Sequence, residues 1–258
     1  MTKRVAVVNQ KGGVGKTTTT VNLATALSTI GKKSLIIDFD PQGNATTGLG
    51  VLKKQGTCGS YEVLIGECSP LEAIISTAIP NLFLMPANLD LSGAEIELVE
   101  LSSRERRLEK ALGSLSETFD YIFIDCPPSL GLLTLNALVA ADKVLVPLQC
   151  EFYALEGLSQ LLCTIETVRK NFNANLELQG IILTMFDSRS SLSTQVAYDV
   201  RQHLKEKVYN THIPRNVRMA EAPSFGKPAI VYDFRCLGSQ AYIQLAKEIL
   251  YQEGDLAA

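Results

Sequence analysis

Few folds accommodate the loop "QKGGVGKTT" at residues 10–18, which lies between an apolar run and a helical pattern. "RVAVVN" precedes it, and "TTVNLATALSTIG" follows it and ends at Gly31, a residue typical of the position just past a helix. Glycines let successive backbone N–H groups turn toward one point, and the start of a helix adds partial positive charge. This strand, loop and helix therefore predict a phosphate-binding loop.

The other apolar runs extend the same pattern along the chain. Each is short, bounded by polar turns and followed by a helical segment: "SLIIDFD", "NLFLMP", "YIFIDCP", "KVLVPLQ" and "LQGIILTMF". Continuous rather than alternating hydrophobicity is typical of strands covered on both faces. We predict an α/β, doubly wound fold of the P-loop NTPase type, with a mainly parallel sheet flanked by helices. Because no linker, repeat or low-complexity tract divides the sequence, residues 1–258 are interpreted as a single domain.

Two helices near the C-terminus are predicted from their apolar stripes. Residues 192–208 carry apolar side chains at intervals of four, and residues 237–254, "LGSQAYIQLAKEILYQEG", form another amphipathic pattern. The first stripe consists of Leu192, Val196, Val200, Leu204 and Val208.

The composition favours a cytoplasmic protein. The longest near-apolar stretch, residues 131–141, is shorter than the ~20 residues of a membrane span, and the chain starts in a strand rather than a signal peptide. The cysteines form no C-x-x-C pair, so we interpret them as buried or incidental thiols rather than metal ligands or disulfide partners. They are Cys58, Cys68, Cys126, Cys150, Cys163 and Cys236.

Each residue of the phosphate loop is expected to contact a particular part of the nucleotide. The Lys16 ammonium reaches the β and γ phosphates, the Thr17 hydroxyl binds Mg²⁺, and Thr18 donates to the α phosphate. The backbone that cradles the phosphates belongs to Gly12, Gly13, Val14 and Gly15.

The loop departs from the usual pattern, which has its first glycine where this chain has Gln10. It matches the variant K-G-G-x-G-K-[ST], which begins at Lys11, and resembles the deviant-Walker-A ATPases of the ParA/MinD group, most closely the small ParA/Soj partition ATPases. The resemblance implies a homodimer in which Lys11 crosses the interface to the phosphates of the other subunit. A cation supplied in trans stabilises transition-state charge as an arginine finger does. The alternative for Lys11 is a solvated loop charge.

Two further segments end in carboxylates. Asp38 and Asp40 sit at alternate positions of one strand end, so both side chains are expected on the same side, toward the phosphates. The resemblance implies that Asp40 positions the attacking water and contributes to the Mg²⁺ site, while Asp38 supports the loop or the metal shell. In the alternative, both cap a turn before Pro41. Asp125 ends "YIFID" where a Walker B aspartate holds Mg²⁺.

The base is predicted to be adenine, because the guanine motif N-K-x-D is absent from the sequence. The resemblance places the base between the segment of Met185 and the loop containing Pro214 and Asn216. Because apolar residues are more often packing than pocket, Met185 and Phe186 have a core alternative.

Basic residues gather in the C-terminal half of an otherwise acidic chain. The net charge is −3, but the segment from 189 to 235 carries eight basic and four acidic residues. "TMFDSRSSLSTQV" and "IPRNVRMAEAPSFGKPAIVYD" resemble ParA/Soj sequences. This implies that an ATP-bound dimer binds double-stranded DNA without sequence preference, placing the protein at the nucleoid, and that a ParB-like partner stimulates hydrolysis. The predicted DNA contacts are Arg189 and Arg218, with Arg201, Lys205, Lys207 and Arg215 as neighbours. Solvated helix surface is the alternative for each.

Two rival functions have specific sequence tests. A MinD-like membrane-associated ATPase would end in a basic amphipathic helix, but from Leu237 onward Lys247 is the sole basic residue and the end is acidic. A membrane partner is therefore not expected. A cluster-carrying relative would pair cysteines across a dimer, and Cys126 and Cys150 show no such spacing.

Overall fold

A computed structural model describes residues 2–52, 57–115 and 118–255. Within these ranges the strands form one seven-stranded sheet in the order β3-β4-β2-β5-β1-β6-β7, parallel throughout except for the β3–β4 pair. The predicted mainly parallel sheet is thus confirmed. The strands are β1 (Lys3–Val7), β2 (Ser34–Asp38), β3 (Ile75–Ser76), β4 (Leu82–Met85), β5 (Tyr121–Asp125), β6 (Lys143–Gln149) and β7 (Glu177–Thr184). Only the two-residue β3 has no counterpart in the sequence prediction.

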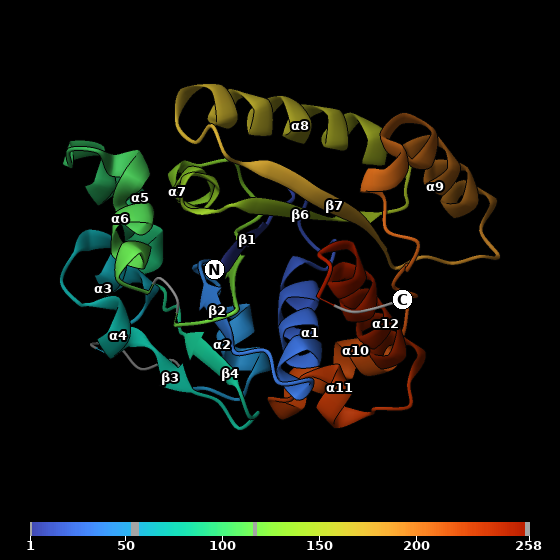
Figure 1. Cartoon of the computed structure of the whole chain (residues 1–258), viewed down its shortest axis with the longest axis horizontal. Helices are drawn as coiled ribbons and strands as arrows, with labels where there is room; N and C mark the ends of the chain where they lie inside the picture. Colours follow the sequence, from blue (N-terminus) through green and yellow to red (C-terminus); the bar gives the residue numbers. More distant parts are fainter. Residues whose placement is uncertain (1, 53–56, 116–117, 256–258) are drawn as a thin grey trace.

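Helices cover both faces of the sheet (Figure 1). The α-helices are α1 (Lys16–Thr29), α2 (Asn44–Gly48), α3 (Ser60–Ile65), α4 (Pro70–Ala73), α5 (Leu91–Glu97), α6 (Arg107–Leu112), α7 (Leu132–Ala140), α8 (Ala154–Asn171), α9 (Ser191–Leu204), α10 (Val217–Glu221), α11 (Ala229–Tyr232) and α12 (Leu237–Gln252). Short 3₁₀ helices are η1 (Leu98–Glu100), η2 (Arg104–Arg106), η3 (Gly113–Leu115), η4 (Lys205–Lys207) and η5 (Ala222–Phe225). Helices α7 and α8 lie on one face, and α1, α11 and α12 on the other (Figure 1).

The buried residues form two hydrophobic clusters, one on each face of the sheet. In β1, Val5 and Val7 belong to the cluster under α1 and α12, while Ala6 belongs to the cluster under α7 and α8. Successive side chains of a strand point to opposite faces, so a strand covered on both sides needs apolar residues at every position. This accounts for the continuous apolar runs in the sequence.

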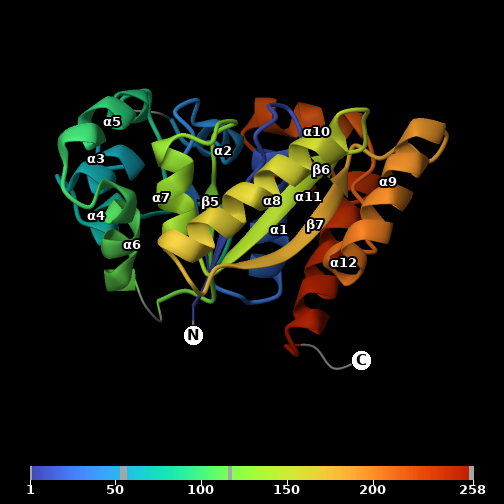
Figure 2. The same ribbon diagram turned by 90° about the horizontal axis from the view of Figure 1, so that it is seen from above.

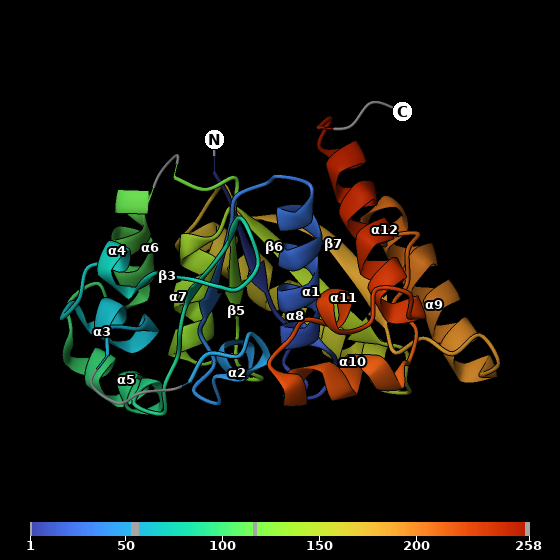
Figure 3. The same cartoon turned by 90° about the horizontal axis from the view of Figure 1, so that it is seen from below.

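The sheet fixes which edge of the molecule carries the chemistry. Both termini lie at one edge, while α2, α5 and α10 lie at the opposite edge, where the parallel strands end (Figures 2 and 3). Ligands of open α/β sheets bind outside the carboxyl ends of the strands. The edge with α2 is therefore where a nucleotide site is expected.

The helix predicted at residues 192–208 is shorter than expected. It ends at Leu204, and Lys205 has a φ of +40°. Val208 leaves the helix and forms a β-bridge with Ile181, beside a hydrogen bond of 3.0 Å from the Tyr209 N–H to the Ile181 carbonyl. The four-residue spacing of apolar side chains includes Val208 because its β-bridge to the edge strand β7 buries the side chain, as helix packing would.

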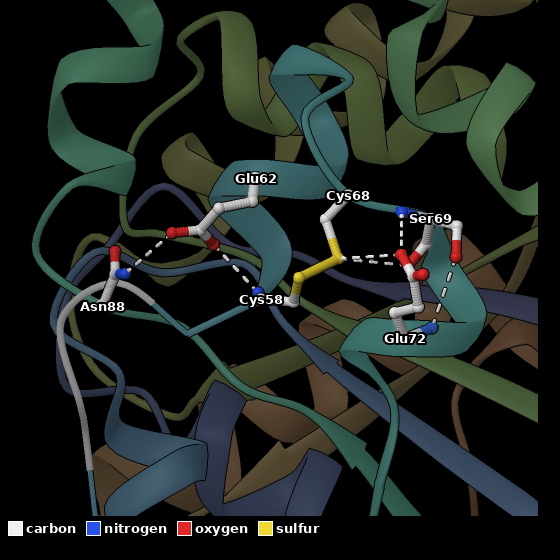
Figure 4. Close-up of a disulfide and its surroundings, with 7 residues drawn as sticks. Cys58, Glu62, Cys68, Ser69, Glu72 and Asn88 are labelled. Carbon is white, nitrogen blue, oxygen red and sulfur yellow. Dashed lines mark hydrogen bonds between the residues drawn. A yellow bond between two sulfur atoms is a disulfide. The ribbon is translucent and has the colours of Figure 1, made fainter.

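The interpretation of the cysteines was wrong for one pair. Cys58 and Cys68 form a disulfide, with Cα atoms 6.0 Å apart, across α3 (Figure 4). Ten residues separate them in sequence, and the turn after α3 brings the second cysteine back to the first. Cys126 and Cys150 are buried free thiols, as predicted.

An ion network joins the two ends of the chain. The Glu253 carboxylate, whose side chain is 7% exposed, accepts hydrogen bonds from the Lys3 and Lys143 ammonium groups at 2.8 and 2.9 Å. The Tyr121 hydroxyl donates to it as well. Burial acts to raise the pKa of Glu253, but the hydrogen bonds from Lys3, Tyr121 and Lys143 outweigh it and hold the pKa below its usual value.

Replacing this carboxylate gives a pH-dependent loss of stability. Glu253→Gln is expected to lower the free energy of unfolding at pH 7 by about 1–3 kcal/mol, since Lys143 loses its nearly buried counter-ion and Lys3 keeps only Asp255 among the described residues. A lowered folded-state pKa contributes stability above the unfolded value of about 4.3 and loses it as the pH falls through the folded value. Urea unfolding at pH 7 and pH 3 measures this. An equal difference between wild type and variant at both pH values would contradict the ionic account.

Candidate active site

Three strands end at the same level beside the phosphate loop. In the sheet register Asp125 of β5 pairs with Val7 of β1 on one side and with Asp38 of β2 on the other. The loop at residues 8–15 leaves β1 at this line and enters α1 at Lys16. The structure therefore brings the loop and two of the predicted aspartates together at the carboxyl edge.

The phosphate loop is anchored on both sides by side chains. The Thr184 hydroxyl at the end of β7 donates to the Val14 carbonyl at 2.8 Å. The Asn9 amide donates to the Pro147 carbonyl at 2.7 Å and its oxygen accepts from the Lys11 N–H at 3.0 Å. Gly13 and Gly15 have φ values of +77° and +90°, which favour glycine. These hydrogen bonds and the two glycine torsions fix the shape of the loop.

Lys16 and Lys11 differ in their surroundings. Lys16 is buried and its ammonium donates to the Lys11 carbonyl at 3.0 Å, within the loop. Burial lowers the pKa of Lys16, and the negative charges of Asp125 and Asp40 oppose this. The Lys11 side chain is 52% exposed and its ammonium forms an ion pair with Glu151, just after β6. Of the two lysines, Lys11 therefore presents its ammonium at the surface and Lys16 does not.

Asp38 and Asp125 form a buried carboxylate pair with different partners. Asp38 accepts from the N–H and hydroxyl of Thr46 at 2.7 and 2.6 Å, and so holds α2 against the end of β2. Burial raises the pKa of Asp38 to about 6. Burial, together with the neighbouring Asp38, raises the pKa of Asp125 to about 8. Asp38 therefore ties α2 to the end of β2, and its predicted role in supporting the loop or the metal shell stays a prediction.

The hydrogen bonding of the two Asp125 carboxylate oxygens indicates whether this site fits a bound cation. Its Oδ1 accepts from the Thr20 hydroxyl at 3.2 Å, whereas the buried Oδ2 has no partner in hydrogen-bond geometry, although the Thr17 hydroxyl lies near enough to act to lower the pKa of the carboxylate. A buried carboxylate oxygen without a donor is stabilised by a bound cation or its water. The residues here fit Mg²⁺, with Thr17 half-buried in the first turn of α1 as the other predicted ligand.

Asp40 lies in the loop between β2 and α2. It is 6% exposed, and its Oδ1 accepts from the Gln42 N–H at 2.9 Å. The turn-capping alternative therefore describes one of its contacts. The negative charge of the same carboxylate also acts to raise the pKa of the Lys16 ammonium, against the lowering by burial.

A cavity of about 200 Å³ adjoins the loop at Gly15 and Thr18. Met185, Pro214 and Asn216, predicted to hold the base, all line it. Phe186 instead packs against His212, with ring centroids 4.5 Å apart.

Sequence reasoning missed two residues of this edge. Tyr242 of α12 lines the cavity, and its hydroxyl shares a hydrogen bond of 3.0 Å with that of Thr19. Glu151, the partner of Lys11, is the second. Neither residue belongs to a motif. In the sequence, Tyr242 cannot be distinguished from the other apolar positions of an amphipathic helix.

The six predicted DNA contacts fall into two groups. Arg189, Arg215 and Arg218 are exposed near the carboxyl edge, where Arg189 pairs with Asp187 at 2.9 Å. The others lie on or after α9, a 14-residue helix about 21 Å long. Arg201 donates to the Tyr209 carbonyl and Lys207 to the Leu178 carbonyl, near the start of β7. Lys205 is exposed beside them.

Among the described residues, no helix has the length and apolar character needed to cross a bilayer. The described part of α12 also uses its apolar face for the core, where Tyr242, Leu245 and Ile249 are buried.

Comparison with known proteins defines the class. A family model described as "AAA domain" matches residues 2–178. In three dimensions the chain is similar to cobyrinic acid a,c-diamide synthase from Mycobacterium smegmatis with bound ADP and magnesium, with a TM-score of 0.85, 39% identity and coverage of 98% of this chain and 97% of that one. The chain is a P-loop ATPase whose cofactors are ATP and Mg²⁺.

Two relatives narrow the class further. The chromosome partitioning protein ParA of Caulobacter vibrioides is 55% identical over 256 residues, covering 98% of this chain and 96% of ParA. The sporulation initiation inhibitor protein Soj of Bacillus subtilis is 53% identical over 249 residues, covering 96% and 98%. The chain belongs to the ParA/Soj family of partition ATPases.

Proposed function

We propose that this protein moves DNA by a cycle in which ATP builds a homodimer, the dimer binds double-stranded DNA without sequence preference, and hydrolysis releases it. A ParB-like partner accelerates hydrolysis, and the protein resides in the cytoplasm on the nucleoid. The observation that carries the proposal is the second lysine of the loop: Lys11 is half exposed at the rim of the site, while Lys16 is buried inside it. One ATPase domain around the single sheet performs the cycle.

The proposed roles follow from the geometry. Lys16 and the loop residues 11–15 bind the phosphates, and Thr18 with the cavity at Met185 holds the rest of the nucleotide. Lys11 stabilises transition-state charge in the partner's site, and Asp40 orients the attacking water. Asp125, Thr17 and Asp40 would hold Mg²⁺, which when bound would neutralise phosphate charge.

DNA is favoured over a membrane as the surface on which the cycle runs. The terminal helix α12 packs its apolar residues against α1, so this face is not available to lipid. Exposed arginines lie instead near the nucleotide edge, where a face-to-face dimer doubles them.

DNA co-sedimentation without nucleotide, with ADP and with ATP tests the proposal. Retention is expected with ATP, and it should decrease as salt rises because phosphate neutralisation releases counter-ions. Sedimentation velocity in the same buffers reports dimer formation. Retention that does not depend on nucleotide would contradict the cycle.

Removing two exposed arginines separates DNA binding from hydrolysis. Arg189→Ala with Arg218→Ala is expected to weaken ATP-dependent DNA binding about tenfold or more at 0.15 M salt, because two phosphate contacts per subunit are lost. Hydrolysis without DNA should stay within about twofold, since neither side chain lines the nucleotide cavity. Arg169→Ala with Lys170→Ala is the matched control, because both side chains are exposed in the last turn of α8 and neither is a predicted DNA contact. An equal loss in both variants would remove the assignment.

A further inference from the structure

A ridge of apolar side chains projects from α5 and η1. Leu89, Ile96 and Val99 are 64%, 77% and 57% exposed. Ile96 and Val99 are three residues apart and lie on one side of the helical segment, and Leu89 lies in the turn that precedes α5. Their neighbours Leu91, Ala94 and Leu98 face inward and are fully buried. The segment therefore has an apolar inner face, used by the core, and a second apolar strip that faces solvent.

Most charges on the rim of this ridge are negative. From residue 88 to residue 103 the sequence has four carboxylates and no lysine or arginine. Among the described residues, the cation beside the ridge is Arg104, whose guanidinium donates to the Val99 carbonyl at 3.2 Å. Asp90 and Glu100 are exposed, and Glu97 accepts from the Tyr61 hydroxyl at the edge of the strip. DNA and an anionic membrane surface are both repelled by this charge. An apolar strip beside carboxylates complements a helix with one apolar face and flanking lysines or arginines.

The fourth carboxylate connects the ridge to the nucleotide site. Glu95 points inward, and its Oε1 accepts from the Leu133 N–H at 3.4 Å, in the first turn of α7. It also contacts Gly131, where a Cβ would collide with it. The segment 126–131 that leads into α7 begins directly after Asp125. Pro128 of this segment lies against the phosphate loop, because a Cβ on Gly12 would come 3.9 Å from the Pro128 Cβ.

We propose that the α5–η1 ridge is the docking surface for a cationic amphipathic segment of a partner protein, which acts on the nucleotide site through Glu95 and the start of α7. The proposal rests on the proposed partition function, because it assigns a place to the partner that stimulates hydrolysis. Docking buries Leu89, Ile96 and Val99 and neutralises the rim. Movement of α5 then displaces Glu95, and with it the segment that follows Asp125.

The surface is tested with a synthetic 18-residue amphipathic leucine/lysine peptide and the ATP-bound protein. Fluorescence anisotropy is expected to show binding that weakens at least tenfold in the double variant Ile96→Ser/Val99→Ser and at least threefold in Glu100→Lys. Leu71→Ser is the matched control, because Leu71 is exposed to 62% on α4 outside the ridge and its loss should leave affinity within twofold. A leucine/glutamate peptide of the same length should not bind.

Hydrogen exchange tests the connection to the site. The leucine/lysine peptide should protect amides of residues 89–101 and change exchange in residues 126–135 at least twofold. In Glu95→Ala, which removes the acceptor of the Leu133 N–H, the first effect should remain and the second should disappear. Equal affinity in all variants, protection confined to other segments, or a dimer that the Ile96→Ser/Val99→Ser variant loses without peptide would each overturn the proposal. DNA co-sedimentation tests the proposed partition function separately. A protein that binds the peptide at this ridge but is not retained on DNA would refute the partition function and leave the docking surface standing.

Discussion

With Lys11 replaced by alanine, ATP hydrolysis is expected to fall about a thousandfold, the lower end of the range for a charge supplied in trans. Nucleotide affinity of the single subunit should change less than threefold, because Lys16 and the backbone of the loop remain. The physical reason is the division between the two lysines: Lys16 is fixed by the Lys11 carbonyl, while the Lys11 ammonium is held only by Glu151 at the surface. Breaking one exposed ion pair costs about 1 kcal/mol or less, so a phosphate readily replaces it.

Single-turnover hydrolysis and equilibrium binding of a fluorescent ATP analogue measure the two quantities. Lys170→Ala, at an exposed lysine in the last turn of α8, controls for the loss of one positive charge. Sedimentation velocity shows whether the dimer survives. A Lys11→Ala variant that both dimerises and hydrolyses ATP at the wild-type rate would show that the lysine is an ordinary surface charge.

The sequence predicted the sheet and the phosphate loop well, for a reason visible in particular residues. Val5 and Ala6 face opposite cores, so both must be apolar, and this appears directly as a continuous run. Gly13 and Gly15 adopt positive φ, so the loop needs glycine there. Both features depend on individual residues and their immediate neighbours, so a single sequence is enough to predict them.

Features that depend on contacts between segments distant in sequence could not be predicted from the sequence. Cys58 and Cys68 meet because α3 turns back, and Glu151 meets Lys11 because β6 ends beside β1. The end of α9 was misplaced because Val208 is buried by Ile181, a contact outside the helix. Among the basic residues, those near the nucleotide edge lie before α9 or around the start of α10, whereas Lys205 and Lys207 follow the end of α9. In each case burial or proximity arises from the fold, and the amino-acid pattern is compatible with more than one arrangement.

Removal of the charge at Asp40 is expected to stop the cycle after ATP binding. Asp40→Ala should lower hydrolysis about a hundredfold or more, as expected for loss of the group that orients the attacking water. Because ATP still binds through Lys16 and the loop, the variant should stay on DNA with ATP long after the wild type has been released. The measurement is phosphate release together with the time course of dissociation from DNA, with Glu166→Ala, an exposed carboxylate on α8, as control.

Asp40→Asn decides which of its contacts matters. Asparagine keeps an oxygen that accepts from the Gln42 N–H, so it preserves the turn, but it lacks the negative charge beside Lys16. If the charge orients water, Asn and Ala lose hydrolysis to a similar extent and both are retained on DNA. If the turn alone matters, Asn hydrolyses ATP at nearly the wild-type rate and only Ala fails. The buried Asp38, whose carboxylate holds Thr46 by two hydrogen bonds, keeps the rest of this loop in place in both variants. The difference between the two substitutions therefore reports the chemistry of Asp40 and not the folding of the loop.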